Sequence, residues 1–407
     1  MSIKEIKTKY YVINVFYMAS LAVFSAIFYV YLDSKGFSYL EINTFSIGFW
    51  IISFVTEIPA GVLSDRYGRK LSLQISIIIR SLGLFFLFWT PNVLVLVISA
   101  ILTAIGESFK SGTLESWAIE KIKEIEPNFD STNFFSLDKF LITGSSMLVG
   151  LLGAQVIGQY NLSLPFIIAP ILLMITGLVV QILLDQDYDV TVNTKGANNK
   201  VSSKFSSFYT DLSEGFYYVK NNKNLFRLII AFLPLQFVLS GPASQWQLYF
   251  QEDDKPIVTG YLSVIISLAG MFGHYLSVRV GNNFINRNRY LIITTSVNGL
   301  MIIMTVLSNM YWLSFMLFSF HVISMASEEA YRFAYLNDEI KTRNRATVLS
   351  IYYTIESAFT VLTFFVIGLI ADQFSLNIAW IFSAVMLLIL GIPMYVSLDK
   401  GRTKERA

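Results

Sequence analysis

The predicted fold class is an all-α integral membrane protein, and three observations predict it. Apolar residues make up 54% of the 407 residues and charged residues only 14%, against about 25% in an average soluble domain. Apolar stretches of about 20 residues, the length of a helix that crosses the hydrocarbon core, recur along the chain. Lys and Arg gather in alternate connecting segments, as they do in cytoplasmic loops. This composition excludes a disordered chain, and the absence of cysteine excludes a disulfide-stapled scaffold.

Twelve apolar stretches predict twelve transmembrane helices. In chain order they cover roughly 10–32, 37–63, 71–90, 93–117, 137–158, 164–184, 225–250, 257–278, 289–308, 311–334, 346–371 and 376–397. The tenth is the least apolar, because it carries His321, Glu328, Glu329 and Arg332. The N-terminal residues lack a short apolar core with a small-residue cleavage site, so no signal peptide is predicted.

The positive charges predict the orientation of these helices. Of the 30 Lys and Arg residues, two, Lys35 and Lys255, lie in segments on the outer side of the membrane. Three more, Arg80, Lys110 and Arg332, lie within spans. The other 25 lie in the segments that are cytoplasmic if the N-terminus is inside. This bias follows the positive-inside rule and places both termini in the cytoplasm.

One long polar segment divides the chain into two groups of six predicted spans. Its second part carries Phe205, Phe208, Leu212, Phe216 and Val219, whose spacing of three and four predicts an amphipathic helix on the inner membrane surface. We therefore expect an N-terminal six-helix bundle over 1–185, a cytoplasmic linker over 186–224 and a C-terminal six-helix bundle over 225–407. Two such halves are typical of transporters with a substrate site near the midplane.

Between the second and third spans, residues 61–70 read GVLSDRYGRK. The run G-x-L-x-D-R-x-G-R-K resembles motif A of the major facilitator superfamily at every characteristic position, and it lies in the cytoplasmic loop where that family has it. Three further segments resemble a bacterial branch that contains many multidrug exporters: they begin at Glu57, at Ser111 and at Arg345. With the twelve spans and their division, the resemblance covers the whole chain.

The resemblance implies a cytoplasmic latch made by Gly61, Asp65, Arg66, Gly68, Arg69 and Lys70. The glycines permit a tight turn and close helix approach. Asp65 is implied to meet the N-terminal end of the eleventh helix, where a carboxylate is favourable by a few tenths to about 1 kcal/mol. Such a latch favours the outward-open state.

Two patterns of the drug antiporters are absent. The fifth span has Gly144, Gly150 and Gly153, which permit close packing, but it lacks the Gly-Pro pair of those proteins. The fourth span lacks their membrane-embedded arginine. Symport or an unusual coupling site therefore stays open beside antiport.

Charged residues inside a span cost about 2.5–3.5 kcal/mol on insertion scales, so each is a candidate functional residue. The fourth span holds Glu107, Lys110 and Glu115. Glu107 and Lys110 are three residues apart and can pair on one helical face. They form either a neutralised structural pair or a site for a cation or proton.

The tenth and eleventh spans hold a second set of candidates. Arg332 can pair with Glu328 at four residues or with Glu329 at three, so one of the two acids can be left without that partner. Glu356 is an isolated acid beside Tyr352 and Tyr353. We expect proton coupling or substrate binding among Glu328, Glu329, Arg332 and Glu356.

Three further features have a structural and a functional interpretation. Arg80 is expected to pair with an acid of the second or fourth span. Gly241-Pro242 breaks the seventh span and serves as a hinge or as a passive kink. Glu57 is a gating or packing residue, and His321 shares a helical face with Glu328 and is a protonation switch or an interhelical hydrogen bond.

The expected function is secondary active transport, with proton-coupled efflux of small amphipathic compounds of the multidrug type as the first hypothesis. The alternatives are a proton-coupled importer and a flippase of an amphiphilic lipid or peptide. An enzyme is disfavoured by the lack of cysteine and by only two histidines, and no ATP-binding P-loop motif is present. We expect a monomer in a bacterial plasma membrane that uses the proton gradient, with no cofactor, no metal and no nucleic-acid partner.

Overall fold

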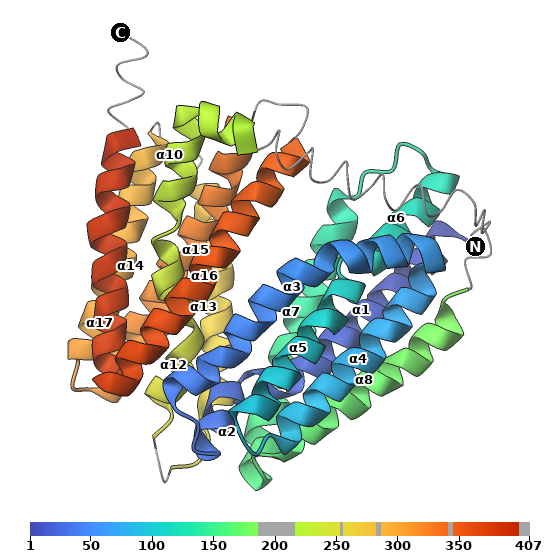
Figure 1. The fold of residues 1–407 in the computed structure, drawn as a ribbon, viewed down its shortest axis with the longest axis horizontal. Coiled ribbons are helices and arrows are strands. Elements are labelled where there is room, and N and C mark those ends of the chain that lie inside the picture. Colours follow the sequence, from blue (N-terminus) through green and yellow to red (C-terminus); the bar gives the residue numbers. More distant parts are fainter. Residues whose placement is uncertain (186–215, 253–254, 282–285, 341–344, 399–407) are drawn as a thin grey trace. The chain divides into compact units, whose positions relative to one another are not determined.

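The computed structural model describes residues 1–185, 216–252, 255–281, 286–340 and 345–398, and these form helices and short connections with no strand (Figure 1). They group into two compact units. The first comprises Met1–Phe37, Thr44–Val201 and Asp253–Ser263, and the second comprises Ser38–Asn43, Ser202–Glu252 and Val264–Ala407. The all-α fold predicted from the sequence is confirmed.

The helices of the N-terminal half are α1 (Ile3–Ser25), α2 (Phe28–Ser34), α3 (Tyr39–Tyr67), α4 (Arg69–Trp89), α5 (Val93–Lys110), α6 (Thr113–Ile125), α7 (Thr132–Leu152), η1 (Gly153–Gly158) and α8 (Leu164–Leu183). Those of the C-terminal half are α10 (Lys223–Phe232), α11 (Leu235–Ser240), α12 (Pro242–Phe250), α13 (Thr259–Arg279), α14 (Arg287–Leu307), α15 (Tyr311–Glu339), α16 (Arg345–Gln373), α17 (Leu376–Met386) and η3 (Leu387–Gly391).

Ten of the described helices or joined helices are long and apolar enough to cross a membrane, and α1 with α2, bent by 43°, makes an eleventh. The predicted tenth span is α15, which is helical over 29 residues but is not among them. It is less apolar because of its charged residues. Multiple crossings of a membrane are therefore supported, and the number twelve and the cytoplasmic termini stay predictions.

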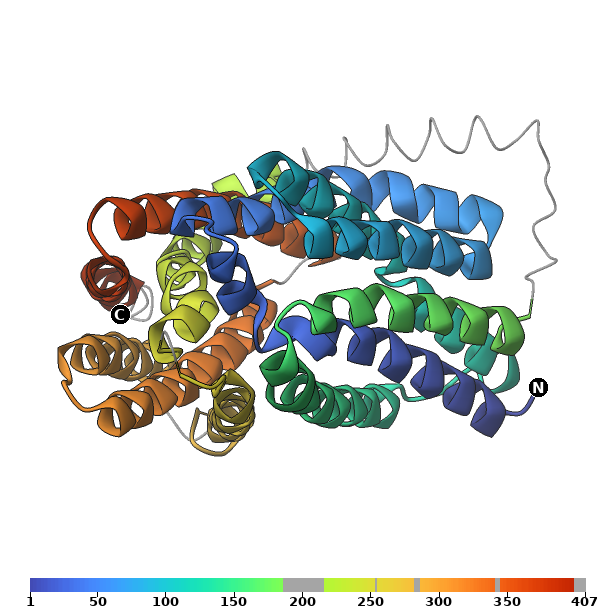
Figure 2. The same cartoon turned by 90° about the horizontal axis from the view of Figure 1, so that it is seen from below.

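Close contacts at glycine hold the first unit together. α1 packs on both α7 and α8, and α4 packs on both α5 and α8 (Figure 2). A Cβ added to Gly153 would lie 1.8 Å from the carbonyl oxygen of Val23, and one added to Gly106 would lie 2.6 Å from Arg80 Cβ. Glycine is needed at these two positions because any side chain would separate the helices. These contacts bring polar groups of α1, α4, α5 and α7 together.

In the second unit, aromatic side chains surround a helix that is broken twice. α11 is a six-residue segment between breaks at Leu233–Pro234 and at Gly241. Phe232, just before the first break, packs against Tyr335, Tyr352 and Tyr395. The second break is the predicted Gly241-Pro242, and the first, at Pro234, was missed.

The amphipathic helix predicted in the linker lies largely outside the described residues. Only its last two apolar positions are described, and they differ: the side chain of Phe216 is exposed, whereas Val219 is buried in the core of the second unit.

Candidate functional site

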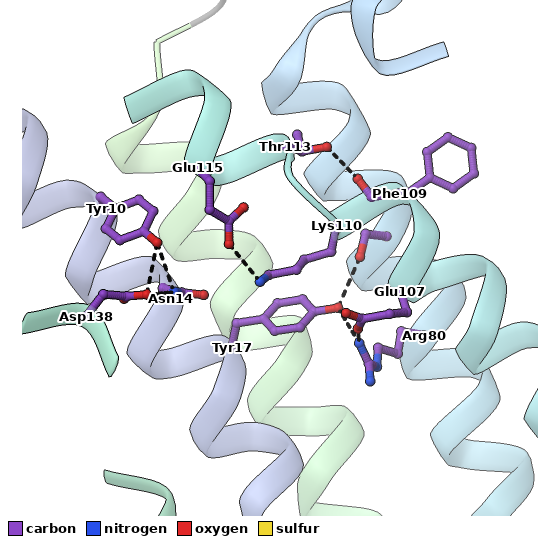
Figure 3. Close-up of polar contacts among 11 residues, drawn as sticks. Tyr10, Asn14, Tyr17, Arg80, Glu107, Phe109, Lys110, Thr113, Glu115 and Asp138 are labelled. Carbon is purple, nitrogen blue, oxygen red and sulfur yellow. Dashed lines mark hydrogen bonds and ion pairs between the residues drawn. The ribbon is translucent and has the colours of Figure 1, made fainter. Parts of the chain in front are cut away.

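The first polar cluster lies where α1, α4 and α5 meet (Figure 3). Arg80 of α4 forms an ion pair with Glu107 of α5, and its Nη1 donates a hydrogen bond to the hydroxyl of Tyr17 in α1 at 3.0 Å. The side chain of Arg80 is 11% exposed, whereas that of Glu107 is 35% exposed. Arg80 thus pairs with an acid of the predicted fourth span, which was one of the two expected partners.

Lys110 pairs with Glu115 instead of Glu107. Its Nζ lies 3.2 Å from Glu115 Oε1, and the two side chains are 12% and 29% exposed. The expected Glu107–Lys110 pair requires one continuous helix, on which the two residues share a face. The chain instead turns between α5 and α6, where Gly112 has a φ of +67°, so the first turn of α6 is redirected and Glu115 reaches the ammonium group.

Tyr17 links these two ion pairs. The cationic groups of Arg80 and Lys110 lie 5.5 Å and 5.8 Å from the centroid of its ring. Both distances are within the range of cation–π attraction. The phenol ring of α1 therefore lies close to both cations of the cluster.

Asp138 of α7 adds a buried carboxylate that the sequence analysis did not single out. It accepts hydrogen bonds from the hydroxyl of Tyr10 at 3.1 Å and from the amide of Asn14 at 2.9 Å, both in α1 (Figure 3). Asp138 was overlooked because it opens the fifth predicted span, where a charged residue beside Lys139 resembles a loop end. The signal that could have found it is Asn14, a polar residue inside the first span.

The motif A residues are only partly described. Arg69 pairs with Glu120 of α6 at 3.0 Å, and Lys70 donates to the carbonyl oxygens of Gln181 and Leu184 at the end of α8. These contacts tie the loop to the first unit, and an ammonium group at a helix C-terminus is favourable.

Gly68 has a φ of +92° and forms the turn between α3 and α4, whereas a Cβ added to Gly61 would meet open space. Arg66 lies over the ring of Tyr67, at 5.3 Å from its centroid. The side chains of Asp65 and of the first residues of α16 lie outside the described part, so the latch stays a prediction.

In the second unit, Glu356 of α16 joins that helix to the broken helix. Its Oε1 accepts hydrogen bonds from Tyr352 at 2.6 Å and from the amide nitrogen of Gln236 at 2.9 Å. The amide oxygen of Gln236 in turn accepts from Thr360 at 2.9 Å. Glu356 is half-buried, and no described basic side chain lies within ion-pair distance of it.

Glu328 and Arg332 of α15 are both buried, whereas Glu329 is exposed. Arg332 Nη1 lies 4.0 Å from Glu328 Oε1, and its Nη2 makes a close contact to the carbonyl oxygen of Phe232. Thr295 of α14 donates to the same Glu328 oxygen at 2.8 Å. Of the two acids that sequence spacing offered to Arg332, Glu328 is the nearer partner.

His321 forms an interhelical hydrogen bond. Its Nδ1 lies 2.7 Å from the side-chain oxygen of Asn298 in α14, and the residue is fully buried. This is the structural interpretation offered by the sequence. Glu57 of α3 is exposed, and its gating role stays a prediction.

Among the candidate residues, the basic side chains are little exposed, whereas most of the acidic side chains are half-buried or exposed. The basic side chains of Arg80, Lys110 and Arg332 are 11%, 12% and 5% exposed. The acids Glu107, Glu115 and Glu356 are half-buried and Glu329 is exposed, whereas Glu328 and Asp138 are buried. Among the described residues, no group of three or more His, Asp or Glu is placed to hold a metal ion.

The family model of the Major Facilitator Superfamily matches residues 10–328. The chain belongs to the major facilitator superfamily. It is a multi-pass membrane protein of a family of transporters, and the recognition made on motif A is confirmed. Across 391 residues it is 21% identical to the uncharacterized MFS-type transporter YxaM of Bacillus subtilis (strain 168), covering 95% of this chain and 94% of that one.

Solved structures of the same fold carry different transport functions. A mutant of the nucleoside transporter NupG matches with a TM-score of 0.75 at 11% identity, over 97% of this chain and 99% of that one. The peptide transporter POT in complex with sulfate matches with a TM-score of 0.72 at 12% identity, over 97% and 94% of the two chains. A bacterial homologue of the lysosomal transporter Spinster matches at 0.69, with 12% identity over 98% and 97%. Identities this low support the fold and leave the substrate to this chain's own residues.

Proposed function

We propose that this transporter exports small cationic, amphipathic compounds in exchange for protons, as multidrug antiporters do. The observation that carries the proposal is the environment of Glu356. This carboxylate lies in a span, is half-buried, and is held by two neutral donors and by no described basic side chain within ion-pair distance.

A carboxylate in this environment suits proton exchange. Partial burial disfavours the charged form, and Arg332, which acts on Glu356 from beyond ion-pair distance, offsets only part of this cost. Binding either a proton or a cation removes the unfavourable charge. The two ligands therefore compete for one group. If the transporter with an empty, charged site changes slowly between its inward-open and outward-open states, this competition makes the exchange obligatory. Each change of state then needs either the proton or the cation bound.

The surroundings of Glu356 suit an amphipathic cation. Tyr352 and Tyr353 precede it in α16, with ring centroids 5.2 Å apart, and Phe359 packs edge-on against Phe237 at 5.6 Å. Aromatic faces attract cations by about 0.5–2 kcal/mol and accept apolar groups as well. Such a surface tolerates ligands of different shapes, which is the property expected of a multidrug site.

The first polar cluster supports the same ligand charge. Its carboxylates, Glu107 and Glu115, are more exposed than their basic partners, at 35% against 11% for Arg80 and at 29% against 12% for Lys110. Exposed carboxylates over buried cations attract positive groups and repel anions. We assign this cluster to substrate attraction and selectivity in the first unit.

The remaining features complete the proposal. Two six-helix bundles, over 1–185 and 225–407, alternate access around the substrate, and the linker over 186–224 joins them on the cytoplasmic side. Asp65 closes the cytoplasmic latch with the other motif A residues, and the breaks around α11 serve as a hinge. The protein works as a monomer in a bacterial plasma membrane and draws its energy from the proton gradient.

The experiment is proton release on substrate binding by the purified protein. In weakly buffered detergent solution containing a pH-sensitive dye, ethidium and tetraphenylphosphonium serve as cationic probes, and binding is followed separately by calorimetry. Wild type and Glu356→Gln are compared, with Glu124→Gln as the matched control because Glu124 is an exposed acid of α6 that belongs to neither polar site.

We expect both wild type and Glu124→Gln to release protons when a probe binds, and Glu356→Gln to release none. Binding with proton uptake would overturn exchange and favour symport. Binding with no proton movement in the wild type would overturn proton coupling at Glu356.

A further inference from the structure

The first break of the seventh span frees a backbone carbonyl that a charged side chain then occupies. In a continuous helix, the amide of Gln236 would bond to the carbonyl of Phe232. Here it bonds instead to Leu233 at 2.9 Å, and Pro234 has no amide hydrogen to offer. The guanidinium group of Arg332, from α15, donates to the Phe232 carbonyl and lies 4.6 Å from the centroid of the Phe232 ring.

Arg332 leaves a second acceptor unused. Its Nη1 is 4.0 Å from Glu328 Oε1, which is too long for a hydrogen bond. Glu328 Oε2 and Arg332 Nε are both buried and form no hydrogen bond of standard geometry among the described residues, although Asn298 and Tyr395 lie near the carboxyl. Because the two residues are four apart on one helix, a change of the Arg332 side chain brings this donor and this acceptor together.

We infer that Arg332 is a positioning residue that exchanges between two acceptors, the Phe232 carbonyl and the Glu328 carboxylate, and that the protonation of Glu328 selects between them. With Glu328 neutral, the guanidinium holds the carbonyl and fixes the break. With Glu328 ionised, the paired arrangement provides two charge-assisted hydrogen bonds, which are stronger than one bond to a carbonyl. The Phe232 carbonyl at the break then loses its hydrogen bond from Arg332, which caps the end of α10.

The polar and ionisable neighbours of Glu328 and Arg332 show which carboxyl group a proton would neutralise. Tyr395 faces both side chains and interacts with both, although its hydroxyl forms no hydrogen bond of standard geometry among the described residues. The other ionisable or polar neighbours are Thr295 and Asn298 of α14 and Tyr352 and Glu356 of α16. Glu328 is the only carboxyl of this set with zero exposure, so its charge cannot be screened by water.

The exchange connects two carboxylates through the segment α11. Gln236, in the first turn of α11, holds Glu356, and Ser240 at its end bonds to Thr363 of α16 at 2.7 Å. Loss of the cap at Phe232 loosens this segment and therefore the amide that positions Glu356. The inference deepens the proposed function, but its test uses neither substrate nor gradient, so the two can fail separately.

The test is hydrogen–deuterium exchange of residues 233–241 in the purified wild-type protein, followed by mass spectrometry from pH 5.5 to pH 8.5. Exchange in α4 of the same sample corrects for the intrinsic effect of pH. Losing a bond to a charged group corresponds to roughly a tenfold change in local opening. We expect corrected exchange in 233–241 to rise by about that factor with pH in wild type and in the control Glu124→Gln.

Glu328→Gln resembles the neutral acid and is expected to stay slow at every pH. Arg332→Gln can hold the carbonyl but cannot pair with an ionised acid, and it should also lose the pH response. A pH response that persists in Glu328→Gln would overturn the inference. The wild-type series decides alone if the variants do not fold, because corrected exchange that does not change with pH excludes the switch.

Discussion

Replacing Gly153 with alanine tests whether the approach of α1 to η1 holds the first polar cluster in place. The added Cβ would lie 1.8 Å from the carbonyl oxygen of Val23 and 2.7 Å from its carbonyl carbon. An ordinary contact needs about 3.4 Å or more, so the helices must separate by roughly 1.5 Å. Both neighbours are backbone atoms, which cannot rotate away. Overpacking of this kind costs roughly 1–3 kcal/mol, and occasionally more.

The matched control lies nine residues earlier on α7. A Cβ added to Gly144 meets nothing within 4 Å. Alanine there removes the cost of a helix-interior glycine, which is about 0.8–1 kcal/mol. Thermal unfolding of the purified variants in one detergent compares them directly, and we expect Gly153→Ala to unfold at a clearly lower temperature than both wild type and Gly144→Ala.

The Gly153→Ala substitution should also affect the first polar cluster. α1 carries Tyr10 and Asn14, which hold Asp138 of α7, so separating the two elements lengthens these hydrogen bonds. If Gly153→Ala proves as stable as Gly144→Ala, the close packing of α1 against α7 and η1 is wrong, and the geometry of the first cluster is wrong with it.

Three further predictions concern the carboxylates. Glu107→Gln leaves Arg80 without its counter-ion and is expected to cost about 1 kcal/mol in thermal unfolding, since Glu107 is 35% exposed and partly screened; no change would argue against the pair. Asp138→Leu strands the Tyr10 hydroxyl and should cost about 1–3 kcal/mol in the same assay, whereas Asp138→Asn keeps an acceptor and should recover most of the loss. Affinity for a cationic probe should fall as the pH is lowered, by up to about tenfold per unit, because protons occupy Glu356 at low pH. Calorimetry of Glu356→Gln should show no such slope, and a slope that persists there would place the competing proton elsewhere.

Much of the fold could be predicted from sequence because the bilayer imposes a simple rule on composition. A span needs about 20 apolar residues, and nearly every predicted span has a helix at the expected place. The GVLSDRYGRK motif identified the family from ten residues. The tenth span was hard to identify because charged residues lower its hydropathy. Those residues include Glu328 and Arg332, on which the further inference rests.

The partners of charged residues were harder to predict because they depend on helix ends. Spacing along one helix suggested a Glu107–Lys110 pair. Because Gly112 has a left-handed conformation, the chain turns there and Lys110 forms its ion pair with Glu115. The contact of Arg332 with the Phe232 carbonyl joins residues 100 positions apart. No local pattern encodes it, because it requires the break at Pro234 and the packing of α15 on α10 at once.

The most direct test of proton-coupled export is proton movement in inside-out vesicles that contain the purified protein. An acidic lumen is imposed, a cationic probe is added outside, and a pH-sensitive dye reports the lumen. We predict that the probe makes the lumen more alkaline with wild type and with Glu124→Gln, and that Glu356→Gln abolishes the response. A lumen that keeps its pH while the probe accumulates inside would contradict it.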